Sequence, residues 1–193
     1  MNPILLDFPS SFDTKRLRIR KPFPGDGEEI NAAIRASIDD LKPWLPFAQN
    51  IPEVEETEAK FREAHAKFLR REDLCFLIFD KETGHFIGST GLHRINWDIP
   101  KFEIGYWIHS AYRNKGYMTE AVEGLCTFAF SKLQAKRLEI RCDSTNTASR
   151  NVAKRLEFTL EGILYHDSLS ADKSELRHTC IYAKLADTPE IVV

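Results

Sequence analysis

The stretch EIGYWIHSAYRNKGYMTE, residues 103–120, decides the fold of this chain. It starts with aromatic and β-branched residues that favour a strand, passes through a short basic loop, and enters a helix. The first N–H groups of a helix have no partner within that helix, and they carry the positive end of its dipole. A strand, loop and helix in this order therefore suit the binding of a phosphate or a pyrophosphate.

Three residues of the loop strengthen this hypothesis. Gly116 can adopt a positive φ and lets the backbone approach an anion without a Cβ in the way. Arg113 and Lys115 add positive charge at the mouth of the same loop. A glycine in a basic strand-to-helix turn is more often a plain connection, however, so both interpretations stay open on the loop alone.

Working outward from the loop, the hydrophobic pattern predicts seven strands and four helices. The strands are expected at residues 16–20, 74–79, 86–95, 102–108, 138–142, 159–168 and 176–185, and the helices at 27–40, 54–71, 116–133 and 147–156. Residues 81–84, KETG, are typical of a hairpin turn between two strands. The order of elements predicts a largely antiparallel sheet with helices packed on it, an α+β architecture.

Length and charge limit the possible classes of protein. The chain has 193 residues, which predicts one domain over residues 1–193 at a typical ~100–200 residues per domain. Its 27 Lys and Arg against 29 Asp and Glu leave a net charge of −2. A protein that grips nucleic acid through a net positive field usually has a basic excess, so we expect no direct nucleic-acid binding.

The cysteines and the apolar segments indicate the compartment. Cys75, Cys126, Cys142 and Cys180 lie far apart, among apolar or strand-like neighbours, and are expected to be small buried side chains rather than disulfides or metal ligands. No histidine has a ligand partner at useful spacing, so no metal is implied. The apolar run near the N-terminus is too short for a signal peptide, and no stretch of ~18 apolar residues predicts a membrane span. We therefore expect a cytoplasmic protein.

A second motif, NTASRN at residues 146–151, follows the loop in the chain. Together the two segments resemble the Gcn5-related N-acetyltransferase (GNAT) family, whose pyrophosphate loop has the form Arg/Gln-x-x-Gly-x-Gly/Ala. In this chain the loop runs from Arg113 through Gly116 to Met118. The segments TKRLRIRKPFPGD, EIGYW, GYMTEA and EFTLEG look like the branch that acetylates the N-termini of ribosomal proteins. The resemblance covers residues 14–185, the expected core of the domain.

The resemblance implies a fold and a reaction. The fold is that of the acyl-CoA N-acyltransferases, with a mixed, mostly antiparallel seven-stranded sheet flanked by about four helices. The reaction is transfer of an acetyl group from acetyl-CoA to a primary amine by direct attack in a ternary complex, without a metal. A protein N-terminal α-amine is the preferred acceptor. The alternatives are a small amine, a route through an acetylated Cys142, and a module that binds acyl-CoA without catalysis.

The resemblance also implies a cofactor site. Acetyl-CoA would lie where strands 102–108 and 138–142 diverge, and an N–H near Trp107 or Ile108 would stabilise the developing oxyanion. The residues expected to hold the pyrophosphate are Arg113, Asn114, Lys115, Gly116, Tyr117 and Met118. Asn146 would meet the pantetheine arm, although it is equally well placed as a helix N-cap.

Proton transfer and acceptor binding are assigned to a second group of residues. Ser149 would protonate the leaving thiolate, although it could also be an ordinary residue of the first helical turn. Glu103 is the candidate base, with His93, Asp167 or a water molecule as alternatives. His93 and Asp167 are also expected to border the acceptor, together with Trp44, which either lines the acceptor mouth or plugs the core.

Two positions depart from the pattern of the family. Met118 stands where many relatives have Gly or Ala, so its side chain must point away from the anion. Glu157 stands where the family usually has a glycine, so it must either accept a strained positive φ or end the preceding helix differently. Relatives are often dimers, and we expect that this chain can form a homodimer.

Overall fold

The computed structural model describes residues 2–186, so residue 1 and residues 187–193 of the expected domain lie outside the described part. Eight strands form one sheet in the order β1-β2-β3-β4-β5-β6-β8-β7. The strands are β1 (Ser11–Asp13), β2 (Leu17–Arg20), β3 (Leu74–Asp80), β4 (Phe86–Asn96), β5 (Lys101–Ile108), β6 (Arg137–Asp143), β7 (Thr159–Leu169) and β8 (Leu176–Leu185). The α-helices are α1 (Gly27–Ala36), α2 (Ile38–Leu41), α3 (Val54–Arg70), α4 (Tyr117–Lys132) and α5 (Thr147–Arg155).

The α+β prediction is confirmed, and the strand count is one too low. The seven predicted strands are present, but β1 is an additional strand whose three residues pair with β2, from Ser11 opposite Arg20 to Asp13 opposite Arg18. The helix expected at residues 27–40 is two helices, because the chain leaves helical geometry at Ser37, where φ is −116° and ψ is 7°.

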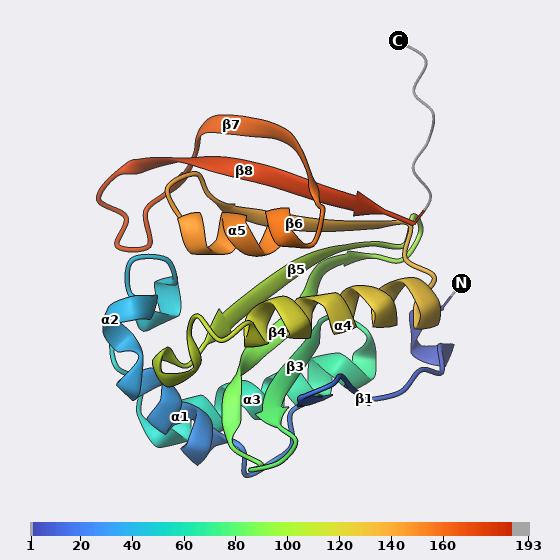
Figure 1. Cartoon of the computed structure of the whole chain (residues 1–193). Coiled ribbons are helices and arrows are strands. Elements are labelled where there is room, and N and C mark those ends of the chain that lie inside the picture. The colour runs from blue at the N-terminus through green and yellow to red at the C-terminus, as the bar shows by residue number, and fades with distance from the viewer. Residues whose placement is uncertain (1, 187–193) are drawn as a thin grey trace.

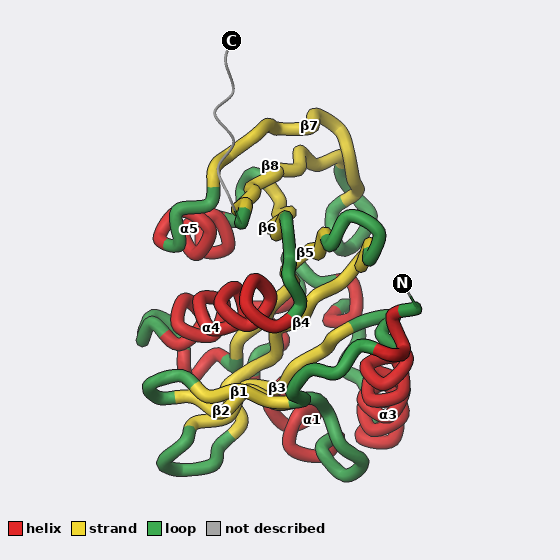
Figure 2. Tube along the Cα trace, turned by 90° about the vertical axis from the view of Figure 1, so that its right-hand side faces the viewer, coloured by secondary structure: helices red, strands yellow, loops and turns green. Residues whose placement is uncertain are grey.

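Helices cover both faces of the sheet (Figures 1 and 2). On one face α4 packs on β1, β2, β4 and β5, and α5 packs on α4 and β6. On the other face α1 and α3 pack on each other and on β4 and β3. The apolar side chains between α1, α3 and the sheet are Ile30, Ala33, Ile34, Phe61, Leu77 and Phe86.

The four cysteines are free, with Cys126 and Cys180 buried and the other two half-buried. No helix within residues 2–186 combines the length and the apolar character that crossing a membrane requires.

The feature that prepares the site is the short parallel pairing of β5 and β6. Every other neighbouring pair in the sheet is antiparallel, and this one is paired only from Lys101 opposite Arg137 to Glu103 opposite Glu139. Beyond these positions β5 continues beside β4 alone, and β6 continues beside β8. The two strands converge at one end and diverge toward the other (Figure 1). The edge of β5 that faces β6 therefore has no strand partner over residues 104–108, and the facing edge of β6 has none over residues 140–143.

A cluster of charges around the buried carboxylate of Glu139 holds the paired end together. The carboxylate of Glu139, only 6% exposed, accepts from Arg137 Nε at 2.7 Å and lies 2.9 Å from Lys101 Nζ. Arg137 also donates to Glu161 on β7 at 2.5 Å. Burial alone would raise the pKa of Glu139, but the hydrogen bonds from Lys101 and Arg137 outweigh it and hold that pKa below its usual range. The cluster connects β5, β6 and β7 at the end of the sheet where β5 and β6 are paired.

Glu157, just beyond the end of α5, adopts the strained positive φ, the first of the two alternatives. Its φ is 59°, in the left-handed region. Its N–H donates to Lys154 O at 3.1 Å, and Phe158 N–H donates to Ala153 O at 3.0 Å, which together form a Schellman motif. Glycine is the residue that adopts this conformation without a Cβ clash.

Replacing Glu157 with glycine is therefore expected to stabilise the protein. The gain from removing strain, about 1–2 kcal/mol, exceeds the loss from the greater freedom of glycine in the unfolded chain, about 0.5–1 kcal/mol. We expect the free energy of unfolding to rise by about 0.5–1 kcal/mol and Tm by about 2–3 °C. Glu157→Ala is the control, because it removes the carboxylate but keeps the Cβ; an equal rise in Tm for this variant would contradict the strain argument.

Candidate active site

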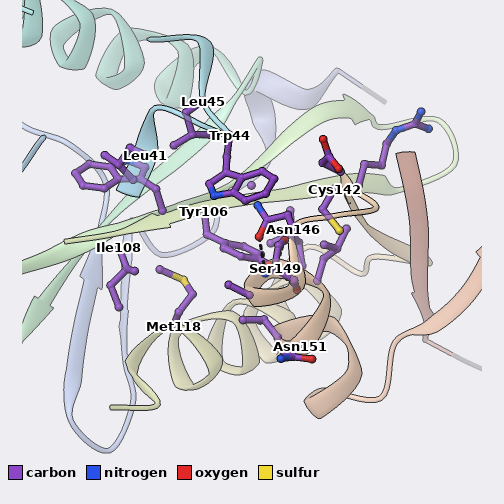
Figure 3. Close-up of a pocket in the computed structure, with 18 of the residues that line it drawn as sticks. Leu41, Trp44, Leu45, Tyr106, Ile108, Met118, Cys142, Asn146, Ser149 and Asn151 are labelled. Carbon is purple, nitrogen blue, oxygen red and sulfur yellow. Dashed lines mark hydrogen bonds between the residues drawn. The ribbon is translucent and has the colours of Figure 1, made fainter. Parts of the chain in front are cut away.

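A cavity of about 740 Å³ opens where β5 and β6 diverge. Its lining comes from both strands, from the loop before α4, from α5, from α2 and the segment between α2 and α3, and from β7 with the segment that follows it. Figure 3 shows Leu41, Trp44 and Leu45 on one side of the cavity and Asn146, Ser149 and Asn151 on the other. The cavity therefore reaches from one layer of helices to the other through the gap in the sheet.

The loop before α4 has the geometry of an anion cradle. Gly116 caps the helix with φ 79°, and a Cβ on it would meet only a guanidinium nitrogen of Arg16, at 3.5 Å. The first backbone bond of the helix runs from Glu120 N–H to Gly116 O at 3.0 Å. The N–H groups of residues 117–119 precede that bond, and all three residues line the cavity. Asn114 supports the turn with a φ of 59°.

The two basic residues of the loop have different surroundings. Arg113 lines the cavity and forms an ion pair with Asp40 on α2. The Ser110 hydroxyl also donates to Asp40, at 2.5 Å, and these two bonds hold the pKa of the Asp40 carboxyl below its ordinary value. Lys115 lies away from the cavity lining, with its ammonium 5.6 Å from the centre of the Tyr112 ring.

Met118 is accommodated by the core. It is 8% exposed and belongs to the apolar cluster beneath α4, although it also lines the cavity. Its side chain therefore packs inward while its N–H remains at the start of the helix.

The start of α5 brings three polar groups together. Asn146 is the N-cap, and its side-chain oxygen accepts from Ser149 N–H at 3.0 Å. The Ser149 hydroxyl lies 2.9 Å from the hydroxyl of Tyr106, which is also 3.1 Å from the backbone oxygen of Ser149. Burial raises the pKa of Tyr106, so its hydroxyl stays protonated at neutral pH. A dashed line in Figure 3 marks one of the contacts in this group.

Tyr106 is the residue that sequence reasoning missed. The available signal was the alternation of the strand, which directs Tyr106 to the same face as Ile104 and Ile108. Nothing in that alternation distinguishes a tyrosine that packs from one that contacts the serine of a helix 43 residues away.

Cys142 lines the same cavity from β6. Burial raises the pKa of its thiol to about 11. At neutral pH the reactive thiolate is therefore only about one part in 10⁴ of the population. The structure does not favour Cys142 as a nucleophile.

The opposite side of the cavity carries the acceptor-side candidates. Trp44 lies between α2 and α3, is 38% exposed, and lines the cavity. Glu103 on β5 also lines it, and its carboxylate lies 3.3 Å from Arg94 Nη1. Asp167 on β7 lines it as well and forms an ion pair with Arg141 at 3.3 Å. Three of the predicted residues are thus brought together around one space.

His93 lies outside this lining. Its Nδ1 is 2.7 Å from the carboxylate of Asp73, and its ring covers Gly91 and Gly105, where any Cβ would lie within 3.0 Å of a ring atom. Of the three candidate bases, only Glu103 and Asp167 face the cavity. Trp107 and Ile108 line it from the stretch of β5 that pairs with β4 but not with β6.

These features define a class of protein. The family model described as an acetyltransferase (GNAT) domain matches residues 16–159. The chain belongs to this family and is an N-acetyltransferase, and acetyl-CoA is the acetyl donor of the family. The residues fit such a donor, because the glycine cradle, the free N–H groups of α4 and the unpaired edge of β5 all face one cavity. Within residues 2–186 no three His, Cys, Asp or Glu side chains are grouped to hold a metal.

Two of the proteins that are similar in sequence have names that refer to ribosomal acetylation. The putative ribosomal N-acetyltransferase YdaF of Bacillus subtilis is 34% identical over 154 residues, which cover 77% of this chain and 80% of that protein. The ribosomal-protein-serine acetyltransferase of Escherichia coli is 26% identical over 154 residues, covering 76% of this chain and 82% of the relative.

Solved structures share the fold. RimL, the ribosomal L7/L12 α-N-protein acetyltransferase, in complex with coenzyme A, superimposes with a TM-score of 0.83 at 23% identity, covering 93% of this chain and 98% of RimL. The microcin C7 self-immunity acetyltransferase MccE, in complex with acetyl-CoA and AMP, gives a TM-score of 0.84 at 20% identity, covering 92% and 97%.

Introducing an acid at Gly116 tests the anion cradle. Gly116→Asp adds both a Cβ at positive φ and a negative charge beside the N–H groups of α4, so we expect affinity for coenzyme A to fall about 100-fold or more. Isothermal titration calorimetry measures this change. Gly84→Asp is the matched control, since Gly84 has φ 74° with open space around it and lies in the β3–β4 hairpin, outside the cavity lining. Equal loss of affinity in both variants would contradict a local role for Gly116.

Proposed function

We propose that this enzyme acetylates the α-amine of a protein N-terminus, with the amine attacking acetyl-CoA directly in the cavity between β5 and β6. The observation that carries the proposal is that the loop before α4 lines the same cavity as Trp44, Glu103 and Asp167. Acetyl-CoA and the acceptor amine can therefore come into contact between β5 and β6, because no side chains of residues 2–186 separate the two groups of residues.

The donor is held by backbone groups in this proposal. The N–H groups of residues 114–119 and the start of α4 take the diphosphate, and Arg113 adds charge. The side chain of Lys115 lies near the Tyr112 ring, outside the cavity lining, so this loop residue contributes through its backbone. The unpaired edge of β5 at Trp107 and Ile108 meets the pantetheine arm and the acyl oxygen. The oxygen of Asn146 is engaged by Ser149 N–H, so its amide nitrogen is the group that is free to donate to the arm.

Ser149 is proposed to protonate the departing thiolate. Its hydroxyl is 2.9 Å from that of Tyr106, which can hold the serine in place and return a proton to it. Tyr106 acts here through Ser149, as a positioning residue. The proton passes from Ser149 Oγ to the sulfur, and a water molecule returns a proton to the serine, either directly or relayed through the Tyr106 hydroxyl, which is itself protonated again at the end of the step.

The acceptor side needs a group that attracts an ammonium ion and accepts its proton. Glu103 is the proposed base, directly or through a water molecule, and Asp167 contributes a second carboxylate. An α-amine has a pKa near 7.7–8.0, so a substantial fraction is already neutral close to physiological pH. The demand on the base is therefore modest, and correct positioning can supply much of the rate.

The choice of a protein N-terminus rests on the relatives and on the mouth of the cavity. The Escherichia coli relative is named for acetylating the serine of a ribosomal protein. The rim of the cavity presents exposed apolar side chains, Trp44 at 38% and Leu169 at 54% exposure, on opposite elements. An extended peptide could pass between such walls with its amine inward.

A panel of acceptors tests this function. Release of free thiol from acetyl-CoA should be fastest with peptides bearing a free α-amine, and the same peptides blocked at the N-terminus should be inactive even when they contain lysine. Faster turnover with amino sugars, polyamines or aminoglycosides would replace the proposed acceptor by a small amine. Tight binding of acetyl-CoA without thiol release for any amine would leave only a binding module.

Ser149→Ala separates catalysis from binding. We expect kcat to fall about 100-fold while the Kd for acetyl-CoA changes less than about threefold, because the hydroxyl acts on the leaving group rather than on the bound donor. Cys142→Ala is the matched control from the same cavity and should keep kcat within about twofold. A large loss of kcat in the cysteine variant would instead support an acetylated Cys142.

A further inference from the structure

Arg16 connects the start of β2 to the loop before α4. Its backbone N–H donates to Glu120 Oε1 at 2.7 Å and its Nε donates to Glu120 Oε2 at 2.6 Å. Its Nη1 donates to the backbone oxygen of Lys115 at 3.0 Å, and its guanidinium lies 4.2 Å from the centre of the Tyr117 ring. One side chain thus contacts the loop, the first residue of α4 and the acid one turn further on.

Glu120 poses an electrostatic problem for an anion site. An acid in the first turn of a helix stabilises that helix, because it faces the positive end of the dipole. The same charge opposes a diphosphate that binds at the same end. Glu120 also lines a second cavity of about 550 Å³, which shares Asn114, Gly116, Thr119 and Arg155 with the larger one.

The surroundings of Glu120 keep its carboxylate ionised and place a positive charge beside it. Burial alone would raise the pKa of Glu120, but hydrogen bonds from Thr14 and Arg16 outweigh it and lower that pKa below its usual value. The Thr14 hydroxyl donates to Oε1 at 2.7 Å. Arg16 is the residue whose guanidinium neutralises the carboxylate.

We propose that Arg16 is a positioning residue for binding of the donor's diphosphate, which it favours by neutralising Glu120 and by holding the loop at the backbone oxygen of Lys115. Arg16 acts through these two groups. The proposal rests on the placement of the diphosphate at the start of α4 and is independent of the acceptor. It assigns a role to a residue that lies about 100 positions from the loop in the sequence.

The first experiment compares a ligand that has the diphosphate with one that lacks it. Arg16→Gln leaves the Glu120 charge unmatched, so we expect the Kd of coenzyme A, measured by calorimetry, to rise about tenfold or more. With acetyl-CoA the KM should rise in parallel while kcat stays within about twofold. S-acetylpantetheine has no diphosphate, and its kcat/KM should change less than about twofold.

A charge cycle identifies the cause. Glu120→Gln should bind coenzyme A at least as tightly as the parent enzyme, and the double variant Arg16→Gln/Glu120→Gln should recover most of the lost affinity. Arg18→Gln is the matched control, because Arg18 lies two residues further on, in β2, and pairs with Asp13 on the exposed surface, at 3.0 Å. It should leave the Kd of coenzyme A unchanged.

Several results would overturn the proposal. These are an unchanged Kd in Arg16→Gln, a double variant as weak as the single one, or an equal loss with S-acetylpantetheine. If Arg16→Gln does not fold, Arg16→Lys and the double variant decide the question. The lysine keeps the charge but cannot make all the contacts of the guanidinium, so its Kd for coenzyme A is expected to be higher than that of the parent, with the double variant closer to the parent. A parent enzyme that fails to bind coenzyme A would overturn the proposed function itself, whereas normal binding by Arg16→Gln would overturn only the role of Arg16.

Discussion

The divergence of β5 from β6 is the constraint on which the rest of the site depends. Two strands that separate inside a sheet leave backbone N–H and C=O groups without partners, and such groups are costly to bury unless something else meets them. The parallel pairing ends at Glu103 opposite Glu139, and the charge cluster around Glu139 holds the strands together up to that point. The gap between the strands is thus part of the sheet's own architecture, and ion pairs stabilise the end at which the strands are joined.

The start of α4 adds the second requirement, a place for negative charge. Free N–H groups and the helix dipole supply it without needing a large excess of basic side chains, which agrees with a chain of net charge −2. Charges near this end are matched in pairs. Arg113 lies against Asp40 and Arg16 lies against Glu120, so the loop is tied to α2 on one side and to the start of β2 on the other.

Much of this arrangement could be predicted from the sequence. Strands and helices with strong periodicity were found where expected, as was the loop around Gly116, because each depends on residues close together in the chain. Strand β1 was missed because three residues carry too little alternation to be recognised. For Glu157 the sequence left two outcomes open, a strained positive φ or a different end of the helix, and the structure has the positive φ.

What could not be predicted depends on contacts between distant segments. The pairing of Arg16 with Glu120 and the contact of Tyr106 with Ser149 join residues 104 and 43 positions apart, and no local pattern indicates either. His93 is a residue that sequence reasoning placed near the acceptor but that a contact with a distant residue directs elsewhere. The pairing of β4 with β5 puts it opposite Glu103, but Asp73 holds its ring over Gly91 and Gly105, away from the cavity lining.

The most direct measurement is a titration of isotope-labelled protein with coenzyme A, followed through its backbone amide resonances. The account predicts that the largest shifts fall on residues 105–108 and 114–119, the unpaired edge of β5 and the start of α4, and that they saturate together. Saturable shifts confined to other parts of the chain, with these two segments unchanged, would contradict it.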